Sequence, residues 1–187
     1  KLHTISNMPN DGGRNFFDGW DPEHPDARAQ LWNPREQYFT NIKLTQSINT
    51  LKLGLQSSWF TEKVIDKDNP LITPYFAVSF DKYYYTTRYN HQITAEKKFK
   101  NRGALNFSGA YSTYEYIKNT MRKDMVMLAE ELTADPGDDD TTRFHAIFSR
   151  ATYVWADPKT RWSVLGGVDV NNESGQGKKI DNSTHQM

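Results

Sequence analysis

The sequence predicts an all-β fold, an antiparallel up-and-down meander of about six long strands that is part of a transmembrane β-barrel. In several segments the side chains alternate between apolar and polar for more than the ~5–6 residues of an ordinary globular strand. Short and long connections between these segments alternate along the chain. No apolar run is long enough for a membrane-spanning helix, whereas a barrel strand needs only one apolar face.

Residues 1–35 are expected to be irregular, because proline and glycine recur throughout them. The segment is also aromatic, which is unusual for a plain flexible linker. An ordered loop that packs on its neighbours and a loop that contacts a ligand both fit this composition. The aromatic residues are Phe16, Phe17, Trp20 and Trp32.

The first two strands are predicted at residues 37–48 and 51–63, joined by a short turn at Asn49 and Thr50. One face is mostly apolar and the other polar. The apolar set is Tyr38, Ile42, Leu44 and Ile48, then Leu51, Leu53, Leu55 and Trp59. The polar set is Asn41, Lys43, Thr45 and Ser47, then Lys52, Gly54, Gln56 and Ser58.

A longer hairpin is predicted at residues 83–120, with a turn at residues 100–103 where Asn and Gly tolerate positive φ angles. Its first arm alternates strictly, and its second arm repeats the pattern. The apolar or aromatic face holds Tyr85, Thr87, Tyr89, His91, Ile93, Ala95, Leu105, Phe107 and Tyr111. The polar face holds Arg88, Asn90, Gln92, Thr94, Glu96, Asn106, Ser108 and Ser112.

The two long connections, residues 64–80 and 121–141, differ in character. The second has apolar residues at helical spacing that end at Pro136 and Gly137, which predicts a short amphipathic helix. Three adjacent aspartates at residues 138–140 are interpreted as a solvated loop tip, because the Gly and Glu positions of a Ca²⁺ loop are missing. The helical pattern consists of Met125, Leu128 and Leu132.

The last two strands are predicted at residues 142–155 and 161–172, joined by a turn at residues 157–160 in which Pro158 presets φ. Phe148 falls on the polar phase of the first of these strands. Residues 173–187 are polar and are expected to form a loop. The apolar phase holds Ile147, Ala151, Tyr153, Trp155, Trp162, Val164, Val168 and Val170, and the polar phase Ala146, Arg150, Thr152, Ser163, Asp169 and Asn171.

The connections and the aromatic residues together indicate an outer-membrane barrel. Such barrels place short turns at one end and long loops at the other, and carry aromatic girdles at both membrane interfaces. Tyr and Trp also favour strands for other reasons, so the girdle is one of two interpretations. The expected girdles are Phe99, Tyr153, Trp155 and Trp162 near the short turns, and Tyr38, Trp59, Tyr83, Tyr84, Tyr114 and Tyr116 near the long loops.

Composition excludes several other classes of function. The chain has no cysteine, so disulfides and thiolate chemistry are excluded, and its net charge of zero argues against nucleic-acid binding. No catalytic or phosphate-binding motif is present, and His91 and His145 lack metal-ligand spacing. We therefore expect no enzyme activity, no cofactor and no metal site.

Three stretches resemble the barrel of TonB-dependent outer-membrane receptors, most closely the large receptors of Bacteroidetes-type bacteria. The first is Tyr-Tyr-Tyr-Thr-Thr-Arg-Tyr-Asn-His at residues 83–91, followed by Lys118-Asn119-Thr120 and Lys123-Asp124. The second is Asp-Pro-Gly-Asp-Asp-Asp-Thr-Thr-Arg-Phe at residues 135–144, with Ser149-Arg150 after it. The third is Gly-Gly-Val-Asp-Val-Asn-Asn-Glu-Ser-Gly-Gln-Gly-Lys-Lys-Ile at residues 166–180. The resemblance covers roughly residues 21–180.

This resemblance implies a barrel of about 22 strands around a plug domain, in the outer membrane of a Gram-negative bacterium. It implies TonB-driven uptake of ferric siderophores or similar bulky nutrients. Residues 1–187 would then be a fragment of the barrel domain, because the plug and the segment that contacts TonB have no counterpart here. The chain begins at Lys1 without an initiator Met or signal peptide, which agrees with an excised piece.

Polar-face residues of such a barrel point into the lumen, and four of them are candidates for ligand binding there. An Arg can attract an anionic ligand such as a ferric siderophore, or pair with carboxylates inside the barrel. A different class of function is a soluble secreted β-module that binds glycans through exposed aromatic residues. The candidates are Arg88, Asn90, Arg150 and Asp169.

Overall fold

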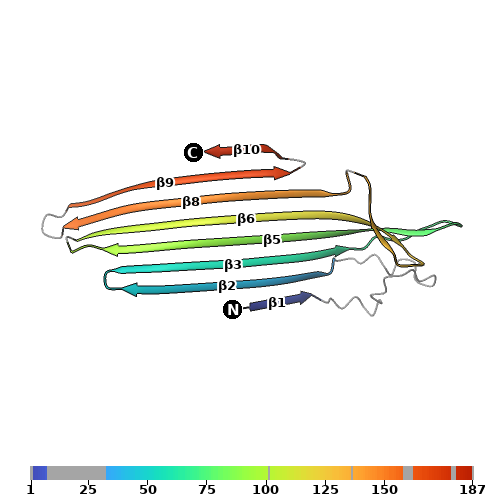
Figure 1. The fold of residues 1–187 in the computed structure, drawn as a ribbon, viewed down its shortest axis with the longest axis horizontal. Helices are drawn as coiled ribbons and strands as arrows, with labels where there is room; N and C mark the ends of the chain where they lie inside the picture. Colours follow the sequence, from blue (N-terminus) through green and yellow to red (C-terminus); the bar gives the residue numbers. More distant parts are fainter. Residues whose placement is uncertain are drawn as a thin grey trace.

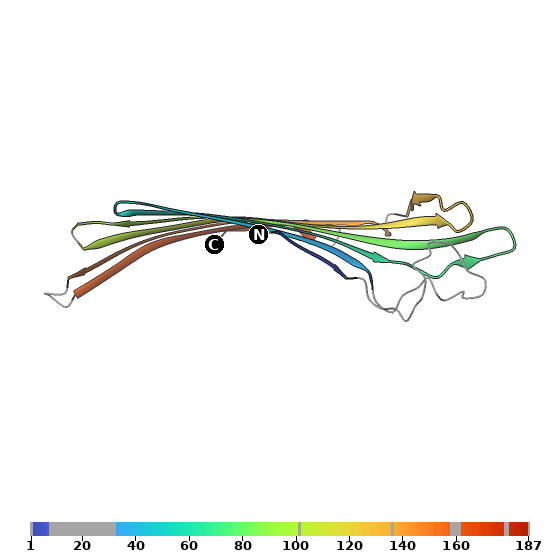
Figure 2. The same ribbon diagram turned by 90° about the horizontal axis from the view of Figure 1, so that it is seen from below.

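A computed structural model describes residues 2–7, 33–100, 102–135, 137–157, 162–177 and 180–186. These residues form ten strands of one antiparallel sheet, and eight of them follow one another in the order β1-β2-β3-β5-β6-β8-β9-β10 (Figure 1). The sheet is a single layer that bends along its length, and it does not close on itself (Figure 2). The strands are β1 (Leu2–Asn7), β2 (Arg35–Ile48), β3 (Leu51–Asp66), β4 (Leu71–Ile72), β5 (Ala77–Lys98), β6 (Gly103–Asp124), β7 (Glu130–Leu132), β8 (Asp140–Asp157), β9 (Trp162–Gly177) and β10 (Ile180–Gln186).

The predicted meander of six long strands is confirmed. β2, β3, β5, β6, β8 and β9 have 14, 16, 22, 22, 18 and 16 residues. Each pairs with the next along the chain, as alternating side chains and short turns require. The long strands extend further into the long connections than predicted, and the short β4 and β7 pair with β5 and β6 there.

The predicted assignment of residues to faces is also confirmed. Directly opposite residues of an antiparallel pair lie on the same face. The register places Leu55 opposite Ile93, and on the other face it places Thr94 opposite Ser108 and Ser108 opposite Arg150. The same parity holds across all six long strands, so every predicted apolar set lies on one face. We call the two surfaces the apolar face and the polar face.

The tight turns use positive φ angles, although not always at the expected residue. Asn49 has φ of 53° in the β2–β3 turn, as its short polar side chain allows. In the β5–β6 turn Arg102 has φ of 66°, while Gly103 already begins β6. Asn101 and residues 158–160 of the last predicted turn lie outside the described residues.

The helix predicted between residues 121 and 141 is wrong. A carboxylate oxygen of Asp124 accepts hydrogen bonds from the backbone amides of Val126 and Met127 at 2.7 and 2.9 Å, which closes a turn instead of a helical first turn. Leu128 then has φ of 57°, and the chain returns as β7. Among the described residues, no helix is long and apolar enough to cross a membrane. The three residues that suggested the helix are Met125, Leu128 and Leu132.

Both chain ends contain strands where irregular structure was expected. β1 pairs with β2, and β9 continues to Gly177 before β10 pairs back on it. The sequence did not predict these strands because they lack the apolar alternation on which the prediction relied. A strand can be held by backbone pairing without that alternation. The prolines and aromatic residues at positions 9–32 lie outside the described residues.

The aspartates at residues 138–140 do not form the expected solvated loop tip. The Asp139 carboxylate accepts a hydrogen bond from the Thr120 backbone amide at 3.0 Å. The Thr120 hydroxyl donates to the Asp138 carbonyl at 2.8 Å. Asp140 begins β8, so the run packs against β6 and ends the long connection.

Candidate functional site

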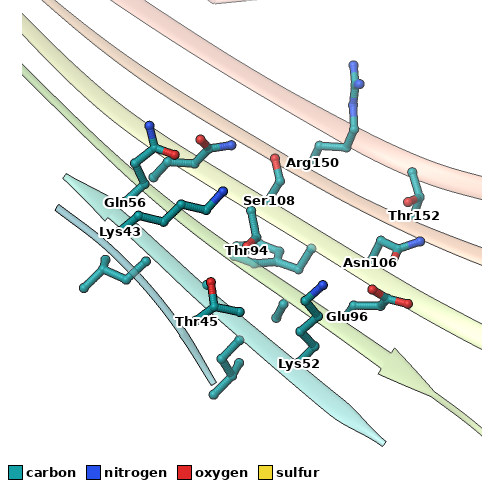
Figure 3. A pocket seen from close by; sticks show the side chains of 16 residues that line it. Lys43, Thr45, Lys52, Gln56, Thr94, Glu96, Asn106, Ser108, Arg150 and Thr152 are labelled. Atoms are coloured by element: carbon teal, nitrogen blue, oxygen red, sulfur yellow. The ribbon is translucent and has the colours of Figure 1, made fainter. Parts of the chain in front are cut away.

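A hollow of about 480 Å³ lies on the polar face, near the ends of the strands that the short turns join (Figure 3). Side chains from β2, β3, β5, β6 and β8 converge on it, because the strand register brings their polar phases together. Neutral amide and hydroxyl groups predominate. The labelled side chains are Lys43, Thr45, Lys52, Gln56, Thr94, Glu96, Asn106, Ser108, Arg150 and Thr152.

The side chains that line the hollow include three cations, Lys43, Lys52 and Arg150, and one carboxylate, Glu96. Lys52 lies directly opposite Glu96 in the ladder between β3 and β5. Arg150 donates two hydrogen bonds to Asp169 on β9, from Nε at 2.7 Å and from a terminal nitrogen at 2.8 Å. This bidentate pair occupies the guanidinium of a predicted ligand-binding residue. Two of the four candidates therefore meet in a structural ion pair across neighbouring strands.

The other two candidates, Arg88 and Asn90, lie further along β5 toward the long connections. Arg88 is central in one row of residues that crosses five strands, which we call the aromatic row. The Phe39 and Phe60 ring centroids are 4.7 Å apart. The aromatic row is Phe39, Phe60, Arg88, Tyr114 and Phe144, paired in that order across β2, β3, β5, β6 and β8.

The guanidinium of Arg88 contacts its neighbour on β6 in the aromatic row. Its central carbon lies 5.4 Å from the Tyr114 ring centroid, within the range of a cation–π contact. The rings of Tyr114 and Phe144 are 6.0 Å apart and tilted by 44°. Phe39 and Phe144 remain 37% and 41% exposed, so the row presents ring surface to solvent.

Hydrogen-bonding side chains border the aromatic row on both sides. On the side of the hollow they include Ser58, Asn90 and Ser112, and on the other side Thr86 and Thr142. Such an apolar strip between polar groups is typical of a ligand-binding surface. It consists of side chains from separate strands that only the register brings together.

A stacked tyrosine pair lies at the border on the side of the long connections. The rings of Tyr84 and Tyr116 are 6.2 Å apart and inclined by 22°. Burial, with Tyr84, Tyr114 and Asp140 nearby, raises the pKa of the Tyr116 hydroxyl above its ordinary value. Tyr116 therefore stays a neutral hydrogen-bond donor throughout the physiological pH range.

This arrangement corrects part of the predicted aromatic girdle. Tyr84, Tyr114 and Tyr116 lie on the polar face, opposite to Tyr83 and Trp59. The prediction grouped them by distance from the long connections and ignored their parity along the strand. Parity was the available signal, since even and odd positions of one strand point to opposite faces.

The apolar face carries an uncharged band across all six long strands, which we call the apolar band. Within it no Asp, Glu, Lys or Arg side chain lies on this face. Nothing among the described residues covers it, and Leu44, Ile93 and Val168 are 60%, 54% and 66% exposed. The band comprises the apolar-face positions of residues 38–48, 51–61, 83–95, 103–113, 145–155 and 162–174.

Charged pairs border the apolar band on the side of the long connections. Glu36 lies opposite Lys63, and Arg143 forms an ion pair with Glu115. Inside the band, Ser57 and the His91 ring nitrogen Nδ1 are 3.0 Å apart and hydrogen-bonded. These two polar side chains within the band therefore satisfy part of each other's hydrogen-bonding capacity.

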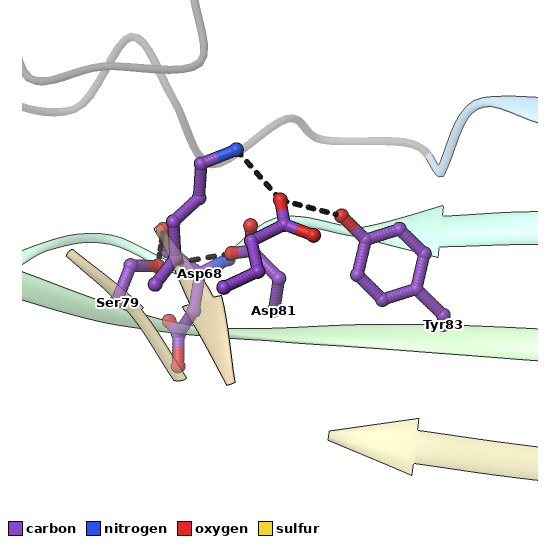
Figure 4. Close-up of polar contacts among 6 residues, drawn as sticks. Asp68, Ser79, Asp81 and Tyr83 are labelled. Carbon is purple, nitrogen blue, oxygen red and sulfur yellow. Dashed lines mark hydrogen bonds and ion pairs between the residues drawn. The ribbon is translucent and has the colours of Figure 1, made fainter. Parts of the chain in front are cut away.

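A second cluster of polar side chains lies where β5 and β6 project beyond the other strands (Figure 4). Asp81 is 1% exposed, and its carboxylate accepts hydrogen bonds from the Ser79 hydroxyl at 3.0 Å and from the Asp68 amide at 3.3 Å. These bonds fasten the β3–β4 connection to β5. Among the described residues, no group of three or more acidic or His side chains is arranged to hold a metal ion.

The same cluster fastens β7 to β6. Lys123 is 4% exposed, and its Nζ lies 2.8 Å from a carboxylate oxygen of Glu130. The Tyr83 hydroxyl donates to the same oxygen at 3.4 Å. With the buried Val78 and Met125 beside it, the cluster has the character of a small structural core.

Comparisons with family models, curated proteins and solved structures found no match to this chain. Function is therefore inferred from the two faces of the sheet.

Proposed function

We propose that this chain forms part of the barrel wall of a TonB-dependent outer-membrane receptor that takes up ferric siderophores or similar bulky nutrients. The observation that carries the proposal is the apolar band. Each of its stretches is about as long as the ~9–11 residues that a tilted transmembrane strand needs. A six-strand surface of this kind fits outer-membrane lipid as its partner.

The polar face supports the same proposal. Over the same lengths of strand it carries charged residues, among them Lys43, Lys52, Arg88 and Asp169. It also contains the hollow, which suits the solvated interior of a barrel. The short turns at one end, and the start of β5 and end of β6 that project with β4 and β7 at the other, match the usual asymmetry of outer-membrane barrels.

The soluble β-module that binds glycans is the second candidate. In a soluble sandwich the apolar face would pack against a second sheet about 10 Å away. The described residues form one layer only (Figure 2), and large apolar side chains of the band such as Trp59, Tyr111 and Trp162 are exposed. The membrane wall is therefore favoured over the soluble module.

Uptake by the cell that makes this chain tests the nutrient part of the proposal. The gene would be deleted, and accumulation of radioactive iron supplied as a ferric siderophore would be measured with and without a functional TonB system. We expect deletion and loss of TonB to reduce accumulation to the same extent. Unchanged accumulation and growth on every iron source and glycan tested would contradict an uptake role.

A further inference from the structure

The two borders of the apolar band differ in charge. On the side of the long connections, Lys63 lies opposite Glu36, and Arg143 forms an ion pair with Glu115. On the side of the short turns, Lys97 is the first apolar-face residue of β5 beyond the band. Its ammonium forms no ion pair or hydrogen bond with any described residue. Positive charge at the short turns is therefore not offset on this face.

The turn between β5 and β6 adds to this positive charge. Residues 97–102 include four cations and no carboxylate. Glu96, which precedes them, lies on the polar face, where it is opposite Lys52 and 3.5 Å from the Lys98 ammonium. The one nearby carboxylate in this segment thus offsets charge on the other face. The four cations are Lys97, Lys98, Lys100 and Arg102.

Apolar side chains border the stem of Lys97. Leu51 of β3 and Leu105 of β6 lie directly opposite it. The nearby Phe99 ring is 40% exposed and contacts the Tyr153 ring. A lysine in such a place packs its methylene groups on apolar neighbours while its ammonium reaches the polar edge of the membrane. A partner at this border must therefore offer an anionic group next to hydrocarbon.

A phospholipid has this combination of groups. Its phosphate can bind the Lys97 ammonium while an acyl chain continues along the band over Ala95, which has Leu53 and Phe107 opposite it on either side. Clusters of cations beside a membrane span attract anionic lipids. In an outer membrane the short turns lie on the periplasmic side, where the leaflet consists of phospholipids. A soluble acidic protein would meet the charge but would leave the apolar neighbours uncovered.

We propose that Lys97 and the cationic β5–β6 turn bind the phosphate of an anionic phospholipid in the leaflet at the short turns. This inference rests on the proposed function, in which the apolar band faces lipid. It assigns a lipid class to one border of the band, and no such preference to the border at the long connections.

Photo-crosslinking of the protein that contains this chain tests the proposal. The protein is placed in vesicles of equal amounts of phosphatidylglycerol, which is anionic, and phosphatidylcholine, which is zwitterionic, with the same acyl chains. Benzoylphenylalanine replaces Leu105, directly opposite Lys97, and mass spectrometry identifies the trapped lipid. We expect phosphatidylglycerol to be trapped about fivefold more often, which is the effect of one cation near a membrane surface.

Four comparisons make the result specific. Lys97→Gln should remove the enrichment, and Lys97→Arg should keep it because the cation remains. Lys98→Gln removes the neighbouring cation, which lies on the polar face beside Glu96, and should leave the enrichment unchanged. The same photo-crosslinker in place of Tyr85, opposite Lys63 near the other border, should trap the two lipids equally.

Equal trapping of the two lipids at position 105 would overturn this proposal and leave the membrane wall standing. The same holds if Lys98→Gln lowers the enrichment as much as Lys97→Gln, or if position 85 shows the same enrichment as position 105. The absence of any trapped lipid at both positions would overturn this proposal and the membrane wall together.

Discussion

At the scale of single residues, small and large side chains on the apolar face fit together across strands. The Tyr153 hydroxyl occupies the place where a Cβ atom of residue 103 would be, so any other residue there requires the Tyr153 side chain to move. The Tyr153 ring also contacts the Phe99 ring, with centroids 6.3 Å apart. An aromatic ring that covers a strand glycine in this way fills the space that a side chain would otherwise occupy.

This contact predicts different costs for two glycines of the same face. Gly103→Ala should destabilise the chain by about 1 kcal/mol, because Tyr153 must move and lose its contact with Phe99. Gly166→Ala should be neutral or slightly stabilising, since nothing lies within 4 Å of its added Cβ. Urea unfolding in detergent, followed by circular dichroism, measures both. Equal costs would contradict the assigned contact.

The faces of single residues were predictable from sequence, whereas their partners were not. Alternation placed Arg88, Asn90, Arg150 and Asp169 on the polar face correctly, because the side-chain period of a strand is two. The bond between Arg150 and Asp169 and the aromatic row depend on the register of separate strands. Alternating apolar and polar residues fit a neighbouring strand equally well after a shift of two residues. The sequence alone therefore does not determine these contacts between strands.

At the scale of elements, the long connections are folded extensions of the sheet. β4 and β7 pair with the projecting parts of β5 and β6, which covers strand edges that would otherwise be open. The sequence signal for a helix there failed because Leu128 has a left-handed φ of 57° and the chain returns to pair with β6 as β7. Strand existence and order were predicted well, since long alternating segments leave few alternatives.

The turn at Asp124 predicts a pH dependence. Hydrogen bonds from the Met127 and Val126 amides hold the pKa of the Asp124 carboxyl below its ordinary value of 3.8. A lowered pKa means that these bonds stabilise the turn above pH 3.8 and that this stabilisation is lost as the pH falls through the native pKa.

NMR titration of the Val126 and Met127 amide proton shifts measures this pKa. The midpoint should lie below 3.8, and Asp124→Asn should abolish the titration while keeping an oxygen acceptor. A midpoint at or above the ordinary value would show that the carboxylate does not accept these bonds.

The ion pair between Lys123 and Glu130 predicts a measurable loss of stability when the carboxylate is removed. Glu130→Gln should destabilise the chain by about 2 kcal/mol, because the Lys123 ammonium stays buried without its carboxylate. Glu131→Gln is the matched control, since Glu131 is the neighbouring residue of β7 and is exposed. Urea unfolding compares the two, and the account fails if the control costs as much as Glu130→Gln.

At the scale of the whole molecule, the sheet has one face with an uncharged apolar band and one polar face. It is also open, because β1 and β10 are the two ends of the strand order among the described residues. Lipid does not tolerate unpaired strand edges, so a membrane wall of this kind requires further strands to pair with them. The proposed barrel thus accounts for both the apolar band and the open edges.

This division predicts opposite responses at adjacent positions of β3. In a closed barrel in lipid vesicles, Leu55→Arg should destabilise the folded state by about 2–4 kcal/mol, because it places a charge on the face proposed to contact lipid. Gln56→Arg should cost less than about 1 kcal/mol, since it faces the hollow. Similar costs at both positions would contradict the assignment of the faces.

Cysteine accessibility in intact cells tests the central claim most directly. The chain has no native cysteine, so single replacements of Leu53, Gln56 and Asp139 each introduce the only thiol within residues 1–187. A membrane-impermeant thiol reagent should label position 139 in intact cells, and position 56 once it reaches the barrel interior. Position 53 should stay protected until detergent replaces the lipid. Equal labelling of positions 53 and 56 in intact cells would show that the apolar band does not face lipid, and would leave the soluble β-module as the better account.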